Sequence, residues 1–490
     1  MSSKPESSER QYSPAAPEQL LARTKHRSYV IRRRRVLGAG GSVAVVLALV
    51  LGGILIPGSS RPGGTHGGHV YTADRIGSAY ELTAAPQAVA AASPRVLGGV
   101  ESAEVGFSLD LLDHLDSSGN STNTLVSPSS LATALAMLEL GAKGSTASGI
   151  AATLRTAGFS AGEQAAGWHS LAAVLAKETS TSGSDLAKVP ELNVANALWV
   201  QDHFAVEPAF IHALSSDFGT GLWQANFESD LTGATDAINQ WTSENTKGLI
   251  KQLFSPGALD VLTRLVIADA VYFDAHWATA FKTATKDRTF YLPSGATVSV
   301  PFMTSQSPSA PATTGSPKPL KVPVAETNSY DAVELPYGGK KLSALIVMPT
   351  TGSLASFVSA LTPSSLARIV KGLSSPAEVE LSMPTFTIRS DDQLNASLSS
   401  MGMAQAFGPD ADFGGINPKV ALQVQAVEQH AYLQVSPKGT VAAAATGIAI
   451  GVSAVEAVHP IVINHPFLFL VRDNATGTIL FESMVENPTG

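Results

Sequence analysis

Few side chains in this 490-residue chain have types and spacing that could support catalysis or metal binding. Ser127 precedes Pro128 but lacks the G-x-S-x-G surroundings of an activated serine, so a helix-start or buried structural serine is favoured. His430, His459 and His465 share neither a helical face nor a metal-type spacing. Cysteine is absent, which excludes disulfides and thiolate chemistry. The sequence therefore predicts no catalytic residue, no metal site and no cofactor.

Charge is unevenly distributed along the chain. Residues 1–35 carry nine Lys or Arg and three Glu, a net charge of +6, so the remainder carries −14. An acidic globular part argues against nucleic acid as a main partner. The 44% hydrophobic content is enough for a large core.

The N-terminal part has the composition of a membrane anchor. Residues 36–56 contain no charge, and about 20 apolar residues span a bilayer as a helix. The basic residues 1–35 should stay cytoplasmic, which places the rest of the chain outside the cell. No A-x-A-like site follows directly, so we expect an uncleaved, single-pass signal-anchor in the cell membrane, with secretion after cleavage as the alternative.

Composition changes again after the apolar segment. Residues 57–102 are rich in Gly, Pro and Ala and have no periodic apolar face, which predicts a flexible linker. From residue 103 the pattern is that of a folded domain. "AEVGFSLDLLDHL" and "SPSSLATALAMLELGAKG" have helical apolar spacing, and "LSALIVMP", "VELSMPTFTI" and "AYLQVS" are of strand type. Helices early and strands late predict an α+β domain over residues 103–490.

Ten segments in order resemble the serpins, the serine protease inhibitor superfamily, here of bacterial type with an N-terminal membrane segment. They include "VANALWV", "INQWTSENTKGLIKQLF", "TRLVIADAVYFDAHWATAF", "AVELPYGGKKLSALIVMP", "GTVAAAATG" and "HPFLFLVRDNATGTILFESMVENP". The resemblance covers residues 103–488. It implies the serpin fold, with three β-sheets surrounded by eight or nine helices and an exposed reactive-centre loop at about 439–464.

The resemblance also gives the stretch "KGTVAAAATGIAIGV" a role. In serpins the loop is bait for a protease, and after cleavage its first part inserts into the main sheet as a new strand. The hinge of that loop would be Gly439, Thr440, Val441, Ala442, Ala443, Ala444, Ala445 and Thr446. The hinge contains no charge or proline that would oppose insertion. The resemblance therefore implies a suicide-substrate inhibitor that traps the acyl-enzyme, and a monomer.

The position of the cleaved bond is estimated by counting residues along the loop from each of its two ends. Counting forward from Gly439 gives Ser453–Ala454, and counting back from Pro466 gives a bond near Val455–Glu456; Val452 is a further alternative. No Lys or Arg occurs between residues 439 and 464, so a trypsin-like pocket finds no anchor. Proteases with small, apolar pockets are the expected partners: elastase-like or subtilisin-like serine proteases, with chymotrypsin-like enzymes as a further class.

The sequence departs from the family in the region that opens for insertion. That region would contain Ser127, Pro128, Ser130, Asp269, Trp277 and Gln429. Where serpins often have an Asn–His pair, this chain has Asp269 and Gln429, and we hypothesise an Asp269–Gln429 or Asp269–Ser127 contact. Pro437 and Val441 also stand where glutamates are common in the family.

Three functions can be compared on the basis of the hinge and of the candidate catalytic residues. The small, uncharged hinge favours an inhibitor over a non-inhibitory serpin that serves as a binding or structural module at the cell surface. A secreted hydrolase is disfavoured because the sequence shows no nucleophile paired with a base.

Overall fold

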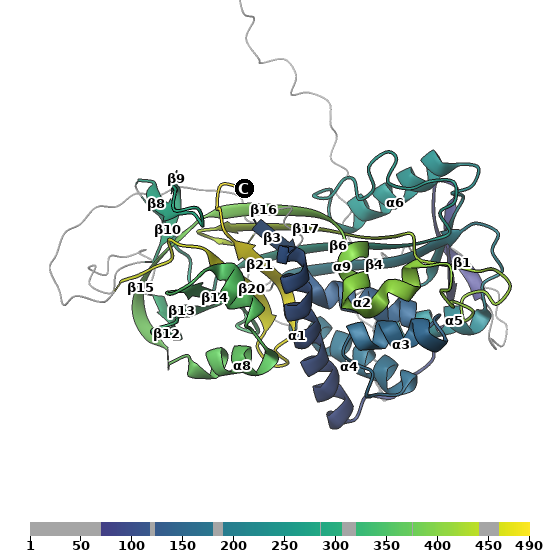
Figure 1. Cartoon of the computed structure of the whole chain (residues 1–490), viewed down its shortest axis with the longest axis horizontal. Coiled ribbons are helices and arrows are strands. Elements are labelled where there is room, and N and C mark those ends of the chain that lie inside the picture. Colours follow the sequence, from purple (N-terminus) through teal and green to yellow (C-terminus); the bar gives the residue numbers. More distant parts are fainter. Residues whose placement is uncertain are drawn as a thin grey trace, which may run out of the picture. The chain divides into compact units, whose positions relative to one another are not determined.

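The computed structural model describes residues 70–117, 123–179, 190–284, 286–305, 320–374, 376–440 and 460–490. All of them belong to one compact unit (Figure 1). Residues 1–35 and 36–56, predicted to be a cytoplasmic tail and a membrane segment, lie outside the described residues, as do residues 441–459.

An eight-stranded sheet forms the centre of the domain. Its order is β1–β2–β5–β4–β6–β18–β17–β16. The bounds are β1 Val70–Ile76, β2 Ala79–Ala84, β4 Glu191–Gln201, β5 Leu222–Ala225, β6 Leu265–His276, β16 Phe386–Gln393, β17 Ala426–Ser436 and β18 Gly439–Thr440.

Two further sheets pack beside the central one, and a short hairpin makes a fourth. The six-stranded sheet, in spatial order, consists of β12 Val324–Glu326, β13 Tyr330–Pro336, β14 Leu342–Pro349, β20 Phe467–Asp473, β21 Ile479–Val485 and β3 Asn123–Val126. The five-stranded sheet consists of β11 Leu320–Val322, β15 Ala377–Pro384, β10 Phe302–Thr304 and β7 Lys282–Thr283, with β19 Pro460–Val462 paired to β15. The hairpin joins β8 Arg288–Tyr291 to β9 Thr297–Val300.

Nine α-helices occur among the described residues, which confirms the predicted α+β class. They are α1 Pro94–Ser117, α2 Pro128–Glu139, α3 Gly144–Thr153, α4 Ala161–Thr179, α5 Pro208–Ala213, α6 Leu231–Asn245, α7 Leu354–Ser359, α8 Pro363–Gly372 and α9 Asn395–Leu398. Short helical turns add Leu214–Phe218, Ser399–Met403 and Ala404–Phe407.

The helices cover the two faces of the central sheet unequally. On one face α6 packs on a small core that contains Trp199 and Trp223 (Figure 1). On the other face α2, α3 and α4 pack over a larger core that includes Leu198 and Ile267. Alternate residues of β4 and β6 therefore belong to different cores, as the period-two geometry of a strand requires. Both strands are buried on both faces, and this explains their continuous apolar runs.

The predicted linker at 57–102 needs a correction. Residues 70–84 form the β1–β2 hairpin, which pairs with β5 and extends the edge of the central sheet, and α1 begins at Pro94 rather than near 103. Ile76 and Ala79 are buried beside Trp223, whereas most other described side chains of β1 are exposed. So few buried residues leave a weak alternating pattern, and for this reason the hairpin resembles a polar linker in the sequence.

Candidate functional site

The boundary between β6 and β17, which we call the seam, is the feature of the central sheet most relevant to function. Residues 266–271 of β6 pair directly with residues 426–431 of β17, in parallel. The neighbouring pairs, β6 with β4 and β17 with β16, are antiparallel. The seam is thus a parallel junction with an antiparallel pair on each side, and parallel pairing is slightly less stable per residue.

At one end of the seam a third strand lies between β6 and β17. Gly439 and Thr440, which we call the hinge pair, form β18 and pair antiparallel with residues 275–276 of β6 and residues 435–436 of β17. The chain reverses direction between β17 and β18 at a turn over Pro437 and Lys438. The first two residues of the predicted hinge are therefore already part of the sheet.

Proline at position 437 suits this turn. The Pro437 carbonyl accepts a hydrogen bond from the Phe281 amide at 2.8 Å, and the Lys438 carbonyl accepts one from the Trp277 amide at 2.9 Å. Both bonds use carbonyl groups of the turn, so the missing N–H of proline does not weaken them. Gly439 is required for a different reason. A Cβ at that position would lie 2.0 Å from the backbone oxygen of Ala275, far inside van der Waals contact.

A buried hydroxyl pair holds Thr440. The hydroxyls of Tyr337 and Thr440 are 2.8 Å apart, and both residues are fully buried. Burial raises the pKa of Tyr337, so its hydroxyl stays protonated at any physiological pH. Trp277 stacks on the Tyr337 ring at 4.6 Å and donates its indole N–H to the Ser436 carbonyl at 2.9 Å. Trp277, predicted for the sheet-opening region, thus lies at the hinge pair.

Farther along the seam a group of five polar side chains lies beneath the sheet. This seam cluster consists of Ser127, Ser130, Asn196, Asp269 and Gln429, and every member is buried. Asp269 and Gln429 come from the two strands of the seam, and Asn196 comes from β4. Ser127 and Ser130 come from the start of α2, where Pro128 is the first helical residue.

Asp269 and Gln429 bond directly across the seam. The Gln429 amide donates to one carboxylate oxygen of Asp269 at 2.5 Å, and the Ser130 hydroxyl donates to the other at 2.5 Å. The hypothesised Asp269–Gln429 contact is confirmed. Burial raises the pKa of Asp269 to about 7, although the bonds from Ser130 and Gln429 act in the opposite direction.

The two remaining members complete the network. The Ser127 amide donates to the Gln429 side-chain oxygen at 2.7 Å, and the Ser127 carbonyl accepts from Gln429 at 3.0 Å. Ser127 therefore bonds to Gln429 rather than to Asp269. Asn196, which the sequence reasoning missed, donates to the Ser130 carbonyl at 3.0 Å. Its signal was a lone polar residue inside the buried run "VANALWV".

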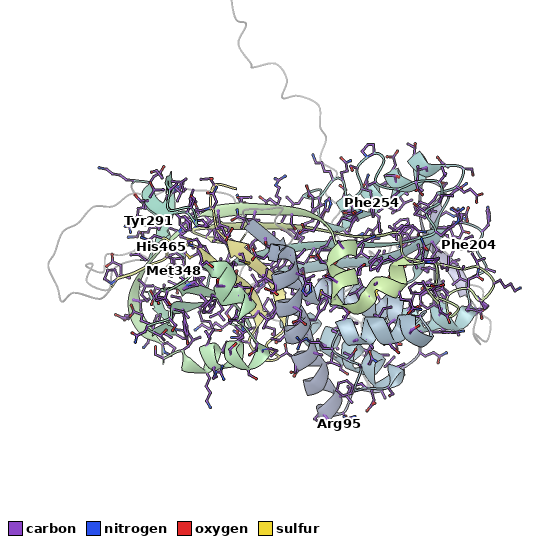
Figure 2. The ribbon with its side chains drawn as sticks, in the orientation of Figure 1. Arg95, Phe204, Phe254, Tyr291, Met348 and His465 are labelled. Carbon is purple, nitrogen blue, oxygen red and sulfur yellow. The ribbon has the colours of Figure 1, made fainter. Side chains whose placement is uncertain are left out.

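The serine and histidine side chains considered as nucleophile or metal ligands in the sequence have other contacts where the structure describes them. The Ser127 hydroxyl donates to the Leu480 carbonyl at 2.6 Å, a structural role that agrees with the sequence prediction. His430 lies 3.4 Å from Asp391, and His465 stacks on Tyr291 at 4.6 Å (Figure 2). No group of three or more His, Cys, Asp or Glu in the described ranges is arranged to hold a metal ion.

The rest of the predicted site lies outside the described residues. This applies to hinge residues 441–446, to the candidate bond residues 452–456 and to His459. The last described residue before this segment, Thr440, lies in the central sheet, and the first after it, Pro460, begins β19, which pairs in parallel with β15 of the five-stranded sheet. The two anchor points of the intervening segment therefore belong to different sheets.

Comparison with known proteins gives one consistent result. The family model for Serpin (serine protease inhibitor) matches residues 102–488. An uncharacterized serpin-like protein of Thermococcus kodakarensis is 33% identical over 78% of this chain and 84% of its own length. Iripin-8 of Ixodes ricinus is 34% identical over 76% and 90%, and plasminogen activator inhibitor 1 of Neovison vison is 33% identical over 78% and 91%.

Solved structures agree with the sequence relatives. Native protease nexin-1 with heparin has a TM-score of 0.66 at 26% identity and covers 80% of this chain and all of its own. A thyroxine-binding globulin complex with thyroxine has a TM-score of 0.67 at 25% identity, over 80% of this chain and 99% of its own. Since the family match spans residues 102–488 and relatives exceed 30% identity over more than three quarters of the chain, this chain belongs to the serpin family.

Proposed function

We propose that this serpin is a suicide-substrate inhibitor of serine proteases with small, apolar specificity pockets. Membership of the family and relatives such as plasminogen activator inhibitor 1 support the coarser statement, an inhibitor rather than an enzyme. The observation that carries the finer proposal is the hinge pair, which already lies between the two strands that a cleaved loop would have to separate.

The register of the hinge pair matches the composition of the residues that follow it. Thr440 pairs with Ala275 and Val435, so a strand continuing in this register would bring Ala444 opposite Val271 and Ala431. The four strand residues in these pairs, Val271, Ala275, Ala431 and Val435, belong to one apolar core. Two residues farther along, Thr446 would meet Asp269 and Gln429. A hydroxyl would therefore lie beside the seam cluster, where it could replace the Asp269–Gln429 hydrogen bond that strand separation breaks.

The energy available to this process is considerable. Insertion replaces one ladder of hydrogen bonds with two, each bond contributing about 1 kcal/mol net. Burial of apolar surface adds roughly 25 cal/mol per Å². A strand of about a dozen residues could release on the order of 10 kcal/mol, enough to drag an attached protease and distort its active site.

Specificity follows from the loop composition. The absence of Lys and Arg between residues 439 and 464 supports elastase-like or subtilisin-like targets, with cleavage at Ser453–Ala454.

The test is incubation with elastase, subtilisin, chymotrypsin and trypsin, followed by a denaturing gel. We expect an SDS-stable complex with elastase or subtilisin.

Two single-charge variants provide a matched pair. Ala444→Glu would bury a carboxylate midway in the inserted strand and should turn the protein into a cleaved substrate. Val441→Glu, on the opposite face and at a position where the family tolerates glutamate, should still form the complex. Cleavage of the wild type without a complex would favour the alternative, a non-inhibitory serpin that serves as a binding or structural module.

We also propose that residues 36–56 anchor the protein in the cell membrane with the domain outside. Within the described ranges, no helix has the length and apolarity needed to cross a bilayer, and residues 36–56 are not among them. Since β1 begins at Val70, only residues 57–69 remain as a spacer, about 45 Å at full extension. Membrane fractionation of cells, before and after deletion of residues 36–56, tests this location.

A further inference from the structure

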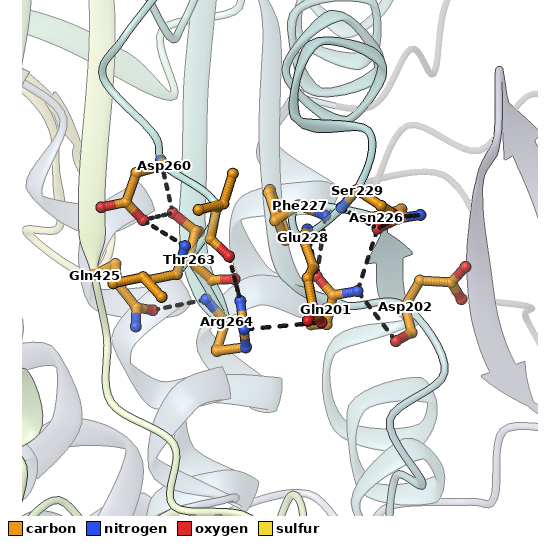
Figure 3. Close-up of polar contacts among 12 residues, drawn as sticks. Gln201, Asp202, Asn226, Phe227, Glu228, Ser229, Asp260, Thr263, Arg264 and Gln425 are labelled. Atoms are coloured by element: carbon orange, nitrogen blue, oxygen red, sulfur yellow. Dashed lines mark hydrogen bonds and ion pairs between the residues drawn. The ribbon is translucent and has the colours of Figure 1, made fainter.

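The end of the seam farthest from the hinge pair is joined by one side chain. Gln425 immediately precedes β17, next to the last residue pair of the parallel ladder. Its side-chain oxygen accepts from the backbone amides of Arg264 at 3.1 Å and Leu265 at 2.9 Å (Figure 3). Its own backbone amide donates to the Leu265 carbonyl at 3.0 Å. Three hydrogen bonds of one residue therefore connect the two sides of the seam at this end.

The partners of Gln425 belong to a block of contacts on the β6 side. The Arg264 guanidinium donates to the Val261 carbonyl at 2.8 Å and lies 3.8 Å from Glu228. The Arg264 carbonyl accepts from the Gln201 amide of β4 at 3.1 Å. The Gln201 side chain in turn accepts from Phe227 and Glu228, which lead into α6 (Figure 3). If β6 and β17 separate here, the contacts of Gln425 must break together with the adjacent ladder that begins at Val266 and Ala426, and this block can move as a unit.

Strand spacing makes these contacts incompatible with a fully inserted loop. Paired strands lie about 4.8 Å apart, so a strand between β6 and β17 moves them to about twice that distance. Continued from the hinge pair, the register brings Thr446 to the seam cluster and Ile450 to Leu265 and Gln425. If the loop inserts only as far as Thr446, Gln425 can keep its hydrogen bonds to Arg264 and Leu265. If it inserts as far as Ile450, these bonds must break.

We propose that Gln425 is a positioning residue that keeps the far end of the seam closed, so that complete insertion is a separate step after insertion at the hinge. The proposal rests on the proposed function, since it concerns the strand that the cleaved loop would form. Under this proposal the polar contacts across the seam break at three places in order: first at the hinge pair, then at the seam cluster and last at Gln425.

The experiment uses the full chain and a fluorescent peptide with the sequence of residues 440–450, which should anneal into the seam. Gln425→Met keeps the length of the side chain and removes the acceptor. We expect the peptide to anneal about tenfold faster, since two hydrogen bonds no longer oppose separation. Hydrogen exchange at the Arg264 and Leu265 amides should accelerate, while Gln425→Glu, which retains an acceptor, should restore slow annealing.

A matched control lies on the same strand. Gln434→Met changes a half-buried glutamine of β17 near the hinge end and should leave the exchange of both amides unchanged. The proposal is overturned if Gln425→Met anneals the peptide at the wild-type rate, or if neither protein takes up the peptide. If Gln425→Met anneals faster but no variant traps a protease, the proposed function fails and the role of Gln425 stands.

Discussion

Asp269 and Gln429 lie on opposite sides of the seam, and their side chains are joined by a 2.5 Å hydrogen bond in the buried interior. A strand inserted between β6 and β17 must break this bond. The seam is therefore held partly by a polar contact whose strength depends on the protonation of one carboxyl group.

The first prediction concerns pH. Burial raises the folded-state pKa of Asp269 to about 7 from the model-peptide value of 3.8. Between these values the folded state holds a proton that the unfolded state has released, so stability falls as pH rises from about 4 to 7 and then levels off. Asp269→Asn should remove this part of the pH dependence, on the order of 2 kcal/mol between pH 5 and 8. Urea unfolding of both proteins at several pH values measures it, and parallel pH profiles would contradict the assignment.

The second prediction concerns the hydroxyl pair at the hinge. Tyr337→Phe keeps the ring stacked on Trp277 but leaves the Thr440 hydroxyl buried without its partner, at a cost of about 1–3 kcal/mol. The Thr440 amide should also exchange faster. A double-mutant cycle with Thr440→Val isolates the pair, and a coupling energy near zero would exclude the bond as a source of stability. Tyr291→Phe, at a 41% exposed side chain, is the neutral control.

The third prediction concerns Gly439. In Gly439→Ala the new methyl group would meet the Ala275 carbonyl, so the hinge pair should leave the sheet. The expected loss in unfolding free energy is about 2 kcal/mol or more, with faster proteolysis after Lys438. Gly162→Ala, in the first turn of α4 where a Cβ meets nothing within 4 Å, should leave stability unchanged or raise it by up to about 1 kcal/mol. Equal effects of the two substitutions would mean that the hinge pair is not held as described.

The fourth prediction concerns the domain boundary. Deletion of residues 1–69 should leave the Tm of the domain unchanged. Deletion of residues 1–85 removes the β1–β2 hairpin, together with the bonds from the Tyr80 hydroxyl to Asp202 and Gln224, both 2.7 Å. It also exposes the edge of β5. We expect a Tm lower by about 5–10 °C and some aggregation. Identical melting curves for the two truncated proteins would mean that the hairpin contributes nothing to stability.

The fifth prediction concerns the cleaved bond. Ser453→Arg supplies a basic residue at the predicted position and should convert the protein into a trypsin inhibitor, seen as an SDS-stable complex. Val455→Arg is the matched variant at the alternative position. A complex with Val455→Arg alone would move the bond by two residues along the loop.

Much of this protein could be predicted from its amino-acid sequence. Ten motifs in order predicted the family and the α+β fold, because long apolar runs and helical stripes are local patterns. The Asp269–Gln429 contact was one of two contacts hypothesised from the resemblance, because these positions match the Asn–His pair that serpins often have.

The remaining features depend on contacts between segments that are distant in the sequence. The β1–β2 hairpin looked like a linker because its strand partner is remote: Tyr80 bonds to Gln224, 144 residues away. Trp277 could be assigned to the opening region but not to the hinge pair, because its place depends on a stack with Tyr337, which directly follows β13 of the six-stranded sheet. The inserted hinge pair and the bonds of Gln425 depend on the register of β6, β17 and β18. Register arises from contacts between distant segments, and no local pattern in the chain specifies it.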